Sequence, residues 1–462
     1  MLSEKQIQAA FDSRRNLFIT GPAGTGKSYR LNQYIASHEN VLVCAPTGIA
    51  ALNIGGDTMH RVFKIPVPAY ELPSFSKSNK NAVPRSILNV VAEADTVIID
   101  EISMARNDVF RFAVRVIRKA ETIKGSKIRI IVCGDFSQLP PVVRKSEASI
   151  MEKFDLDPNG YAFTTPEWKS CKFKVVELTE VKRQENAEFT GELNEIRTGN
   201  FKNLDYWNQF INPDPDYDNA VVICGTNAEA ARINEAYLDG LPGNLVALQA
   251  EVRGRVTAGY VDEIILVKEN CKVIFIVNDN ETCQYKNGSF GIIRAINKDN
   301  IVVEINGRTT VVFPHKFPIY AYDCVDGELI KKEVGSITQY PFKVGKAITI
   351  HKSQGQTFDK VIISPEIFAS GQLYVALSRV RDPEGLTLLS ELKPEYLILN
   401  KEVKKFYDNN YTWPEKKTAA KKMAAAKTKA SKPKAAAAKK KPGTVKRSPK
   451  RTTARRSIAD KV

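Results

Sequence analysis

Two short segments of the chain carry residues suited to the hydrolysis of a nucleoside triphosphate. The first, Gly21-Pro22-Ala23-Gly24-Thr25-Gly26-Lys27-Ser28, has the spacing of a phosphate-binding loop. Its backbone N–H groups would wrap the phosphates, Lys27 would hold the β and γ phosphates, and Ser28 would ligate Mg²⁺. The second closes an apolar run about 70 residues downstream with Asp100 and Glu101. We expect Asp100 to hold Mg²⁺ through its water shell and Glu101 to polarise the attacking water.

The elements predicted around these segments belong to a doubly wound parallel sheet. Four apolar runs are typical of buried parallel strands: Asn16–Thr20, Val41–Cys44, Thr96–Ile99 and Ile128–Cys133. Each is followed by a loop and usually by a helix, so ligands should lie at the carboxyl ends of the strands. A second such region has candidate strands at Val221–Cys224, Ala347–Ile350, Lys360–Ile363 and Leu386–Leu389.

The pattern predicts an α/β fold in several parts. We expect a first nucleotide-binding domain at 1–174 and a second at 175–244 and 339–400. Residues 245–338 are richer in short strands joined by turns, which predicts a small antiparallel, barrel-like insertion. Its candidate strands are Lys272–Val277, Gly291–Ile296, Ile301–Ile305 and Thr309–Phe313.

The basic character of the chain is confined to its end. Residues 415–462 hold 18 Lys and Arg and two acids, whereas residues 1–414 hold 50 of each sign, against a total net charge of +16. The tail is built from Lys, Ala, Pro, Ser and Thr and lacks the residues needed for a core, so we expect it to be disordered. Its composition favours binding to a nucleic-acid backbone, and its KRSPKR segment is also compatible with nuclear import.

Composition argues against several other classes. There is no run of about 18 or more apolar residues and no apolar core near Met1, so we expect neither a membrane span nor a secretion signal. The seven cysteines are scattered without a CxxC pair. They are expected to be reduced structural thiols in a reducing compartment, not a disulfide scaffold or a zinc site.

Seven ordered blocks carry a resemblance to a known family. Besides the phosphate loop with its acidic partner, they are Leu2–Gln6, Ala45–Ala51 with Gly56–His60, Gly134–Pro141, Leu178–Gln184, Ala347–Thr357 and Tyr374–Arg381. They resemble superfamily-one DNA helicases of the Pif and RecD type, closest to the Pif branch, over nearly all of 1–395. The resemblance implies two RecA-like P-loop NTPase domains, with an SH3-like barrel inserted in the second.

It also implies an ATP-dependent DNA helicase. Such an enzyme would move 5′ to 3′ along single-stranded DNA, as a monomer, and unwind forked or tailed duplex in replication, repair, recombination or telomere maintenance. ATP and Mg²⁺ would be its cofactors. The tail suggests a eukaryotic or large-virus setting, and hence a nucleus or a viral replication compartment.

In the first domain the resemblance assigns five roles. Gln6 would contact adenine, and Gln138 would sense the γ-phosphate, a task that suits an amide because it both donates and accepts. Thr47, Thr58 and His60 would contact single-stranded DNA, although His60 is also compatible with a core histidine.

In the second domain the resemblance assigns Arg183 to the nucleotide phosphates and Arg379 to the role of arginine finger. The residues expected to face DNA are Thr349, His351, Lys352 and Ser353, and those expected toward the nucleotide are Gly355 and Gln356. Leu193–Arg197 fits a helix whose charges form a solvated face.

The strand-separating wedge is expected within about 63–92, where Tyr70, Pro73 and Phe75 are candidates for stacking on bases. Two other functions stay open, the first because this region is weakly marked. One is a translocase that does not separate duplex. The other is a chromatin-like packaging or scaffold protein with a vestigial ATPase, against which the intact Lys27, Glu101, Gln138 and Arg379 argue.

Overall fold

The computed structural model describes residues 2–76, 82–217, 220–254, 256, 261–279, 282–364 and 369–410. Met1–Asn409 form one compact unit, and Asn410–Val462 are assigned to a second. The basic tail at 415–462 therefore lies outside the described residues, as do residues 77–81 of the predicted wedge. Among the described helices, none combines the length and hydropathy that a bilayer-spanning segment needs.

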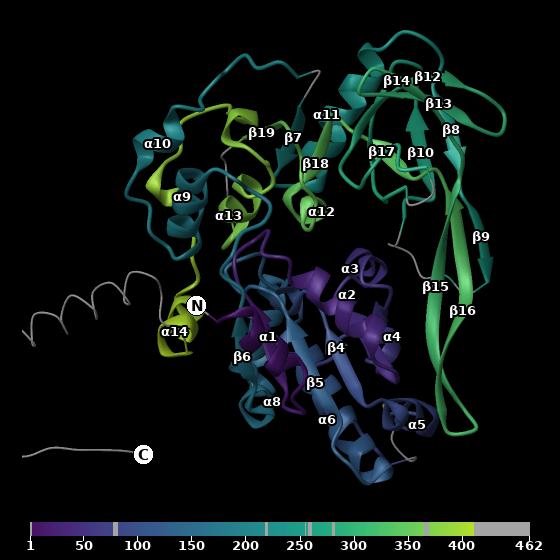
Figure 1. The fold of residues 1–462 in the computed structure, drawn as a ribbon, viewed down its shortest axis with the longest axis vertical. Coiled ribbons are helices and arrows are strands. Elements are labelled where there is room, and N and C mark those ends of the chain that lie inside the picture. Colours follow the sequence, from purple (N-terminus) through teal and green to yellow (C-terminus); the bar gives the residue numbers. More distant parts are fainter. Residues whose placement is uncertain are drawn as a thin grey trace, which may run out of the picture. The chain divides into compact units, whose positions relative to one another are not determined.

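The first lobe is built on a six-stranded parallel sheet with the order β3-β2-β4-β5-β1-β6 (Figure 1). Its strands are β1 (Leu17–Thr20), β2 (Val41–Ala45), β3 (Asp57–Thr58), β4 (Thr96–Ile99), β5 (Arg129–Cys133) and β6 (Lys174–Glu177). The four strands predicted here are confirmed to within one residue at each end. Its helices are α1 (Glu4–Phe11), α2 (Lys27–Ser37), α3 (Gly48–Asn53), α4 (Met59–Val62), α5 (Arg85–Glu93), α6 (Asn107–Lys124), α7 (Ala148–Lys153) and α8 (Pro166–Cys171).

Alternation along β1 explains why helices cover both faces of this sheet. Leu17 and Ile19 belong to the buried cluster that includes residues of α1 and α2. Phe18 points to the other face, where its ring lies 5.3 Å from that of Trp168 in α8. Successive side chains of a strand point to opposite faces, so a strand that is apolar throughout requires cover on both sides.

The predicted boundary after residue 174 falls inside this sheet. β6 pairs in parallel with β1, with Leu17 opposite Lys174 and Thr20 opposite Glu177. The first lobe therefore continues beyond the expected limit. Arg183, which the sequence placed in the second domain, follows this edge strand of the first sheet.

The second lobe contains a four-stranded parallel sheet with the order β18-β7-β19-β20. Its strands, β7 (Val221–Cys224), β18 (Ala347–Thr349), β19 (Val361–Ile363) and β20 (Leu386–Leu388), lie where they were predicted. The helices that accompany them in the chain are α9 (Ala187–Arg197), α10 (Leu204–Asn208), α11 (Asn227–Gly240), α12 (Ile350–Ser353) and α13 (Gln372–Leu377).

The β-rich insertion contains a five-stranded antiparallel sheet with the order β14-β13-β12-β11-β17. These strands are β11 (Lys272–Phe275), β12 (Phe290–Ile296), β13 (Ile301–Ile305), β14 (Arg308–Val312) and β17 (Phe342–Val344), and a separate pair joins β8 (Val246–Gln249) to β10 (Ile264–Val267). β17 lies beyond the predicted limit at 338, because it pairs with β11 and not with the parallel sheet.

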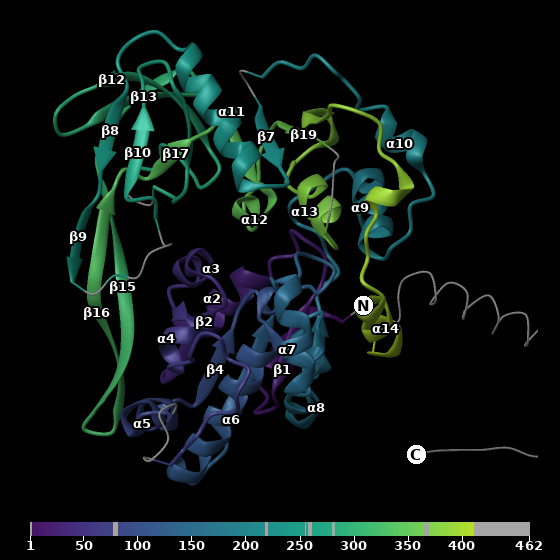
Figure 2. The same ribbon diagram turned by 180° about the vertical axis from the view of Figure 1, so that it is seen from behind.

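A long hairpin, not expected from the sequence, extends from the insertion to the first lobe (Figures 1 and 2). It consists of β15 (His315–Val325) and β16 (Glu328–Gln339), and β9 (Glu251–Gly254) pairs with β16. Asp326 and Gly327 both have positive φ, which fits the tight turn that matches strand twist. The Tyr322 hydroxyl accepts a hydrogen bond from Val43 N–H at 3.0 Å, and Lys331 donates to Gly55 O, so the hairpin is attached to the first lobe.

The last described helix, α14 (Lys401–Asn410), packs against the first lobe. The Phe406 ring stacks on Phe163 with centroids 4.4 Å apart and meets Phe136 edge-on at 5.4 Å. This helix lies just beyond the predicted end of the second domain at 400.

The structure gives a mixed result for the predicted wedge. Tyr70 is only 8% exposed and Pro73 is buried, so neither offers a ring for stacking. Tyr70 instead hydrogen bonds to Glu147 and packs against Phe154. Phe75 is 38% exposed and keeps the exposure that stacking requires.

Candidate nucleotide and DNA sites

The phosphate loop joins β1 to α2 and depends on glycine at two close approaches. Gly21 has φ +139°, and a Cβ there would lie 2.0 Å from Leu178 O. Gly24 has φ +77°, and its Cβ would lie 2.5 Å from Arg183 Cβ. The segment after β6 thus packs directly on the loop, which brings Arg183 to the predicted phosphate site.

Lys27 lies at the start of α2 with its ammonium turned back toward the loop. Its Nζ donates to Gly21 O at 2.8 Å and to Pro22 O at 2.9 Å. Loss of solvent lowers the pKa of Lys27, against the opposing effect of the Asp135 carboxylate. Charged nitrogen and loop amides therefore gather where a triphosphate would bind.

One cavity of about 470 Å³ brings together all five residues predicted to be catalytic. They are Lys27, Glu101, Gln138, Arg183 and Arg379. Gly355 and the loop from Ala23 to Ser28 also line it, whereas Gln356 and Gln6 do not. Gln6 is exposed on α1, where its side-chain oxygen accepts from Ser3 N–H at 2.9 Å and completes a capping box.

The two arginines supply concentrated positive charge to this cavity. Arg183 donates to Ser378 O at 3.2 Å. Arg379, which is 1% exposed, donates to Val375 O at 2.8 Å. Burial lowers the pKa of Arg183 to about 10 and, with Arg183 close by, that of Arg379 to about 9. Cations whose charged form is destabilised by burial fit a site for a polyanion, so these residues suit a triphosphate.

Asp100 and Glu101 follow β4 as expected, with Glu101 in the left-handed conformation at φ +49°. Glu101 N–H donates to Asp100 Oδ1 at 2.9 Å. Burial raises the pKa of both carboxyls; for Glu101 the Asp100 charge adds to the rise, while Lys27 and Arg379 oppose it. Gln354 of the second lobe also donates to Glu101 Oε2 at 2.9 Å, a contact that the sequence did not indicate.

A second cavity of about 510 Å³ lies beside the first and contains the predicted metal ligands. Ser28, Asp100 and Glu101 line it, and they offer one hydroxyl and two carboxylates. Oxygen donors of this kind are those that Mg²⁺ prefers, so the residues fit the predicted ion.

The same second cavity collects three of the predicted DNA contacts, Thr47, His351 and Lys352. His351 is half-buried and Lys352 is exposed at the short helix α12. The cavity thus has a nucleotide side and a side that can meet a polynucleotide.

Thr349 and Ser353, by contrast, do not face a groove as predicted. Thr349 is 3% exposed and accepts from Lys352 N–H at 3.2 Å, which caps α12. Ser353 is fully buried and donates to Ile350 O at 2.8 Å. Both hydroxyls stabilise the turn that presents its neighbours, because a helix of four residues has few backbone hydrogen bonds of its own.

Thr58 and His60 line neither cavity. His60 is half-buried, and burial lowers its pKa while Asp108 raises it and Arg106 lowers it. His60 therefore lies away from both cavities and is not fully buried as a core histidine would be.

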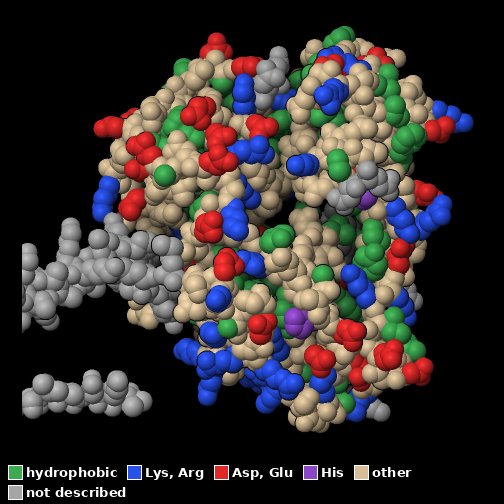
Figure 3. Space-filling view, viewed as in Figure 1, with side chains coloured by type: hydrophobic (Ala, Val, Ile, Leu, Met, Phe, Trp, Pro, Cys, Tyr) green, Lys and Arg blue, Asp and Glu red, His purple; other side chains and the backbone are tan. Residues whose placement is uncertain are grey.

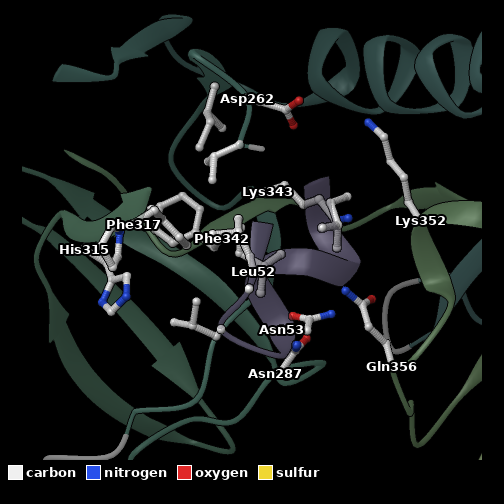
Figure 4. Close-up of a pocket in the computed structure, with 18 of the residues that line it drawn as sticks. Leu52, Asn53, Asp262, Asn287, His315, Phe317, Phe342, Lys343, Lys352 and Gln356 are labelled. Atoms are coloured by element: carbon white, nitrogen blue, oxygen red, sulfur yellow. The ribbon is translucent and has the colours of Figure 1, made fainter. Parts of the chain in front are cut away.

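A third cavity, of about 360 Å³, lies between α3 and the insertion (Figure 4). Leu52, Phe317 and Phe342 contribute apolar surface, and Lys352 reaches its rim. Gln356, expected toward the nucleotide, lines this cavity and the second one but not the phosphate cavity, and its Oε1 is buried without a hydrogen-bond partner among the described residues. Charges of both signs lie over the face shown in Figure 3, with Lys and Arg side chains gathered along its lower left edge.

Sequence reasoning missed a buried polar group that joins the two lobes. Arg197, expected on a solvated face, is 4% exposed and donates to Asp135 Oδ2 at 2.8 Å. Tyr407 donates to Asp135 Oδ1 at 2.9 Å and accepts from Phe136 N–H at 3.0 Å. Burial alone would raise the pKa of Asp135, but Arg197 outweighs it and lowers that pKa. No pattern in the neighbouring sequence indicates that Arg197 is buried, because its partner Asp135 lies 62 positions away.

A second missed contact joins α13 to the phosphate loop. The Tyr374 hydroxyl accepts from Ala23 N–H at 2.7 Å, and Tyr374 is 3% exposed. The resemblance assigns a role to Arg379 in the same block, and no feature of the sequence marks Tyr374.

Comparison with known proteins agrees with this geometry. A profile described as PIF1-like helicase matches residues 4–206. The ATP-dependent DNA helicase Pif1 of Campylobacter jejuni is 31% identical over 82% of this chain and 89% of its own length. The chain belongs to the PIF1-like helicase family. It is also 32% identical to the longer ATP-dependent DNA helicase PIF1 of Xenopus laevis, of which it spans 62%.

Solved structures of family members share the fold. The crystal structure of Bacteroides sp Pif1 in complex with ADP-AlF4 aligns with a TM-score of 0.78 and 32% identity, over 89% of this chain and 98% of that one. Bacteroides Pif1 bound to ssDNA aligns with a TM-score of 0.62, over 88% and 97%. The α/β fold with parallel sheets is therefore that of Pif1 helicases, as predicted.

Proposed function

We propose that this helicase uses ATP hydrolysis to move 5′ to 3′ along single-stranded DNA and to separate duplex DNA. The observation that carries the proposal is a single cavity lined by Lys27 and Glu101 of the first lobe and Arg379 of the second. Relatives named as ATP-dependent DNA helicases, and a relative solved with ssDNA, support the choice of DNA as the track.

The residues of the cavity have distinct tasks in this proposal. Lys27 and the loop amides hold the triphosphate, and Glu101 orients the attacking water. Arg379 stabilises the negative charge that develops on the γ-phosphate, a contribution typically worth about 10³ to 10⁵ in turnover. Ser28 and Asp100 would hold Mg²⁺, which when bound neutralises phosphate charge.

Movement follows because these groups belong to different lobes. The triphosphate attracts Arg379 toward Lys27 and so favours a closed cleft, and hydrolysis weakens that attraction. The proposed DNA contacts come from both lobes: Thr47 from the first, and His351 and Lys352 from the second. A change in the distance between the lobes therefore changes the distance between their contacts with the DNA backbone.

The remaining parts have proposed roles as well. We assign the lobes as RecA-like domains and the insertion as an SH3-like barrel. The tail at 415–462 adds nonspecific contacts to DNA phosphates, and the chain works as a monomer on single-stranded, forked or tailed DNA. Because its relatives come from bacteria as well as eukaryotes, nuclear localisation rests on the tail alone, and none of the reported relatives supports a viral compartment.

The test is an unwinding assay with ATP on matched duplexes that carry either a 5′ or a 3′ single-stranded overhang. We expect strand separation on the 5′-tailed substrate only. DNA-stimulated hydrolysis without separation on either substrate would instead identify a translocase. A chain ending at residue 414 should keep its ATPase but bind DNA with a weaker dependence on salt, since each lost phosphate contact reduces that dependence. Loss of nearly all function on truncation would favour the scaffold.

A further inference from the structure

Gln354 lies in the turn that follows α12, the helix that carries the proposed DNA contacts His351 and Lys352. It connects this turn of the second lobe to Glu101 of the first lobe. Its Nε2 donates to Glu101 Oε2 at 2.9 Å, across 253 positions of sequence. Its Oε1 is buried and has no hydrogen-bond partner among the described residues. The amide is therefore only half satisfied, and its contact with Glu101 is the one that fixes its direction.

Glu101 lies at the border between the two cavities and lines both of them. Gln354 lines the second cavity and not the phosphate cavity. Its amide engages one oxygen of the Glu101 carboxylate from outside the phosphate cavity. An oxygen that already accepts a hydrogen bond from Gln354 is less able to accept one from the water that attacks the γ-phosphate, so the contact opposes catalysis.

The turn that carries Gln354 is short and is linked at both ends to functional residues. It follows α12, where His351 and Lys352 line the second cavity. Arg379 donates hydrogen bonds to backbone oxygens on either side of Gln354, to Ser353 O and to Gln356 O, each at 3.2 Å. A DNA strand that contacts α12 therefore acts on a segment that is hydrogen bonded to both Glu101 and Arg379. A displacement of about 1 Å would take the Gln354–Glu101 pair beyond hydrogen-bonding distance.

We propose that Gln354 is a positioning residue that engages the Glu101 carboxylate until DNA contacts His351 and Lys352 and moves the turn. Release lets Glu101 orient the attacking water, so that ATP hydrolysis is slow without DNA and fast with it. This inference rests on the proposed function and adds to it the residue that couples DNA binding to hydrolysis.

The test compares the full chain with its Gln354→Leu variant, whose side chain has nearly the same size but cannot donate. Turnover of ATP and KM are measured without DNA and with saturating oligodeoxythymidine. We expect turnover without DNA to rise at least about tenfold, the factor that corresponds to the lower range for a hydrogen bond to a charged group. Turnover with DNA and the KM for ATP should stay unchanged. Gln354→Asn, which keeps the amide but is one methylene too short, should behave in the same way if the leucine variant folds poorly.

Gln8→Leu is the matched control, because Gln8 also donates to a carboxylate, Asp12 Oδ1, at 2.9 Å but on the exposed surface of α1. Gln8→Leu should change neither the turnover without DNA nor the turnover with DNA. An unchanged ratio of DNA-stimulated to basal turnover in both folded Gln354 variants, or an equal fall in the two turnovers, overturns the inference. A parent protein whose ATPase does not respond to DNA would instead contradict the proposed function.

Discussion

Two of the groups of polar contacts that join the two lobes differ in burial and in how completely their hydrogen bonds are satisfied. In the first, both oxygens of Asp135 accept hydrogen bonds, from Arg197 and Tyr407, and all three side chains are at most 4% exposed. In the second, Glu101 and Gln354 are half-buried, and Gln354 Oε1 has no partner among the described residues. A fully paired buried network is costly to break, whereas a half-satisfied one can be exchanged. We infer that the first group is a permanent joint and the second a contact that changes during the cycle.

Substitution of Lys27 in the phosphate cavity should have the largest effect. It should lower the turnover of ATP and leave the stability of the fold unchanged. Lys27→Ala removes a charge that stabilises the transition state, so turnover should fall by at least about 10² to 10³. DNA affinity, measured by fluorescence anisotropy, and the thermal midpoint should stay close to those of the parent protein. Normal ATP hydrolysis in this variant would show that the phosphate site is wrongly assigned.

Substitution at the permanent joint should act on stability. Arg197→Ala leaves the Asp135 carboxylate buried without its ion pair, so the free energy of unfolding should fall by about 3–5 kcal/mol in chemical denaturation. Arg253→Ala breaks an exposed pair with Glu251 and serves as the control, with an expected loss of less than about 1 kcal/mol. Equal losses in the two variants would remove the distinction between the two groups of contacts.

The smallest effect is expected from a single hydroxyl of the same joint. Tyr407→Phe leaves Phe136 N–H without its acceptor and takes one donor from Asp135, which should cost about 1–3 kcal/mol of unfolding free energy. Calorimetry should show a lower thermal midpoint than in a Tyr396→Phe control at a partly buried ring. A change no larger than in the control would mean that α14 is held by its aromatic packing alone.

The features that could be predicted from the sequence are those with a local signal. The phosphate loop, the acidic pair after β4 and the buried strands each depend on neighbours within a few positions, and the structure places them as expected. The sequence also predicts that Thr349 and Ser353 lie on the surface of the turn after β18, whereas both side chains are buried. Spacing alone does not show that a four-residue helix uses those hydroxyls for its own hydrogen bonds.

The features that could not be predicted pair residues far apart in the chain. Arg197 meets Asp135, Tyr407 meets Asp135 across 272 positions, and Gln354 meets Glu101 across 253. Each residue looks ordinary in its own segment, and only the topology of the two sheets brings the partners together. The β15–β16 hairpin was missed for a related reason: the start of β16 carries Lys331, Lys332 and Glu333 in succession and lacks the apolar alternation of a half-buried strand.

The β15–β16 hairpin also limits how the motor can move. A strand of 11 residues, as in β15, spans about 37 Å. It is fixed to the insertion at one end and, through Tyr322, to the edge of the first sheet near the other. Rotation of the second lobe must therefore shift the hairpin along the first lobe or break its contacts there. The distance that the lobes move in each cycle is then limited by the hairpin, outside the cleft, as well as by the nucleotide within it.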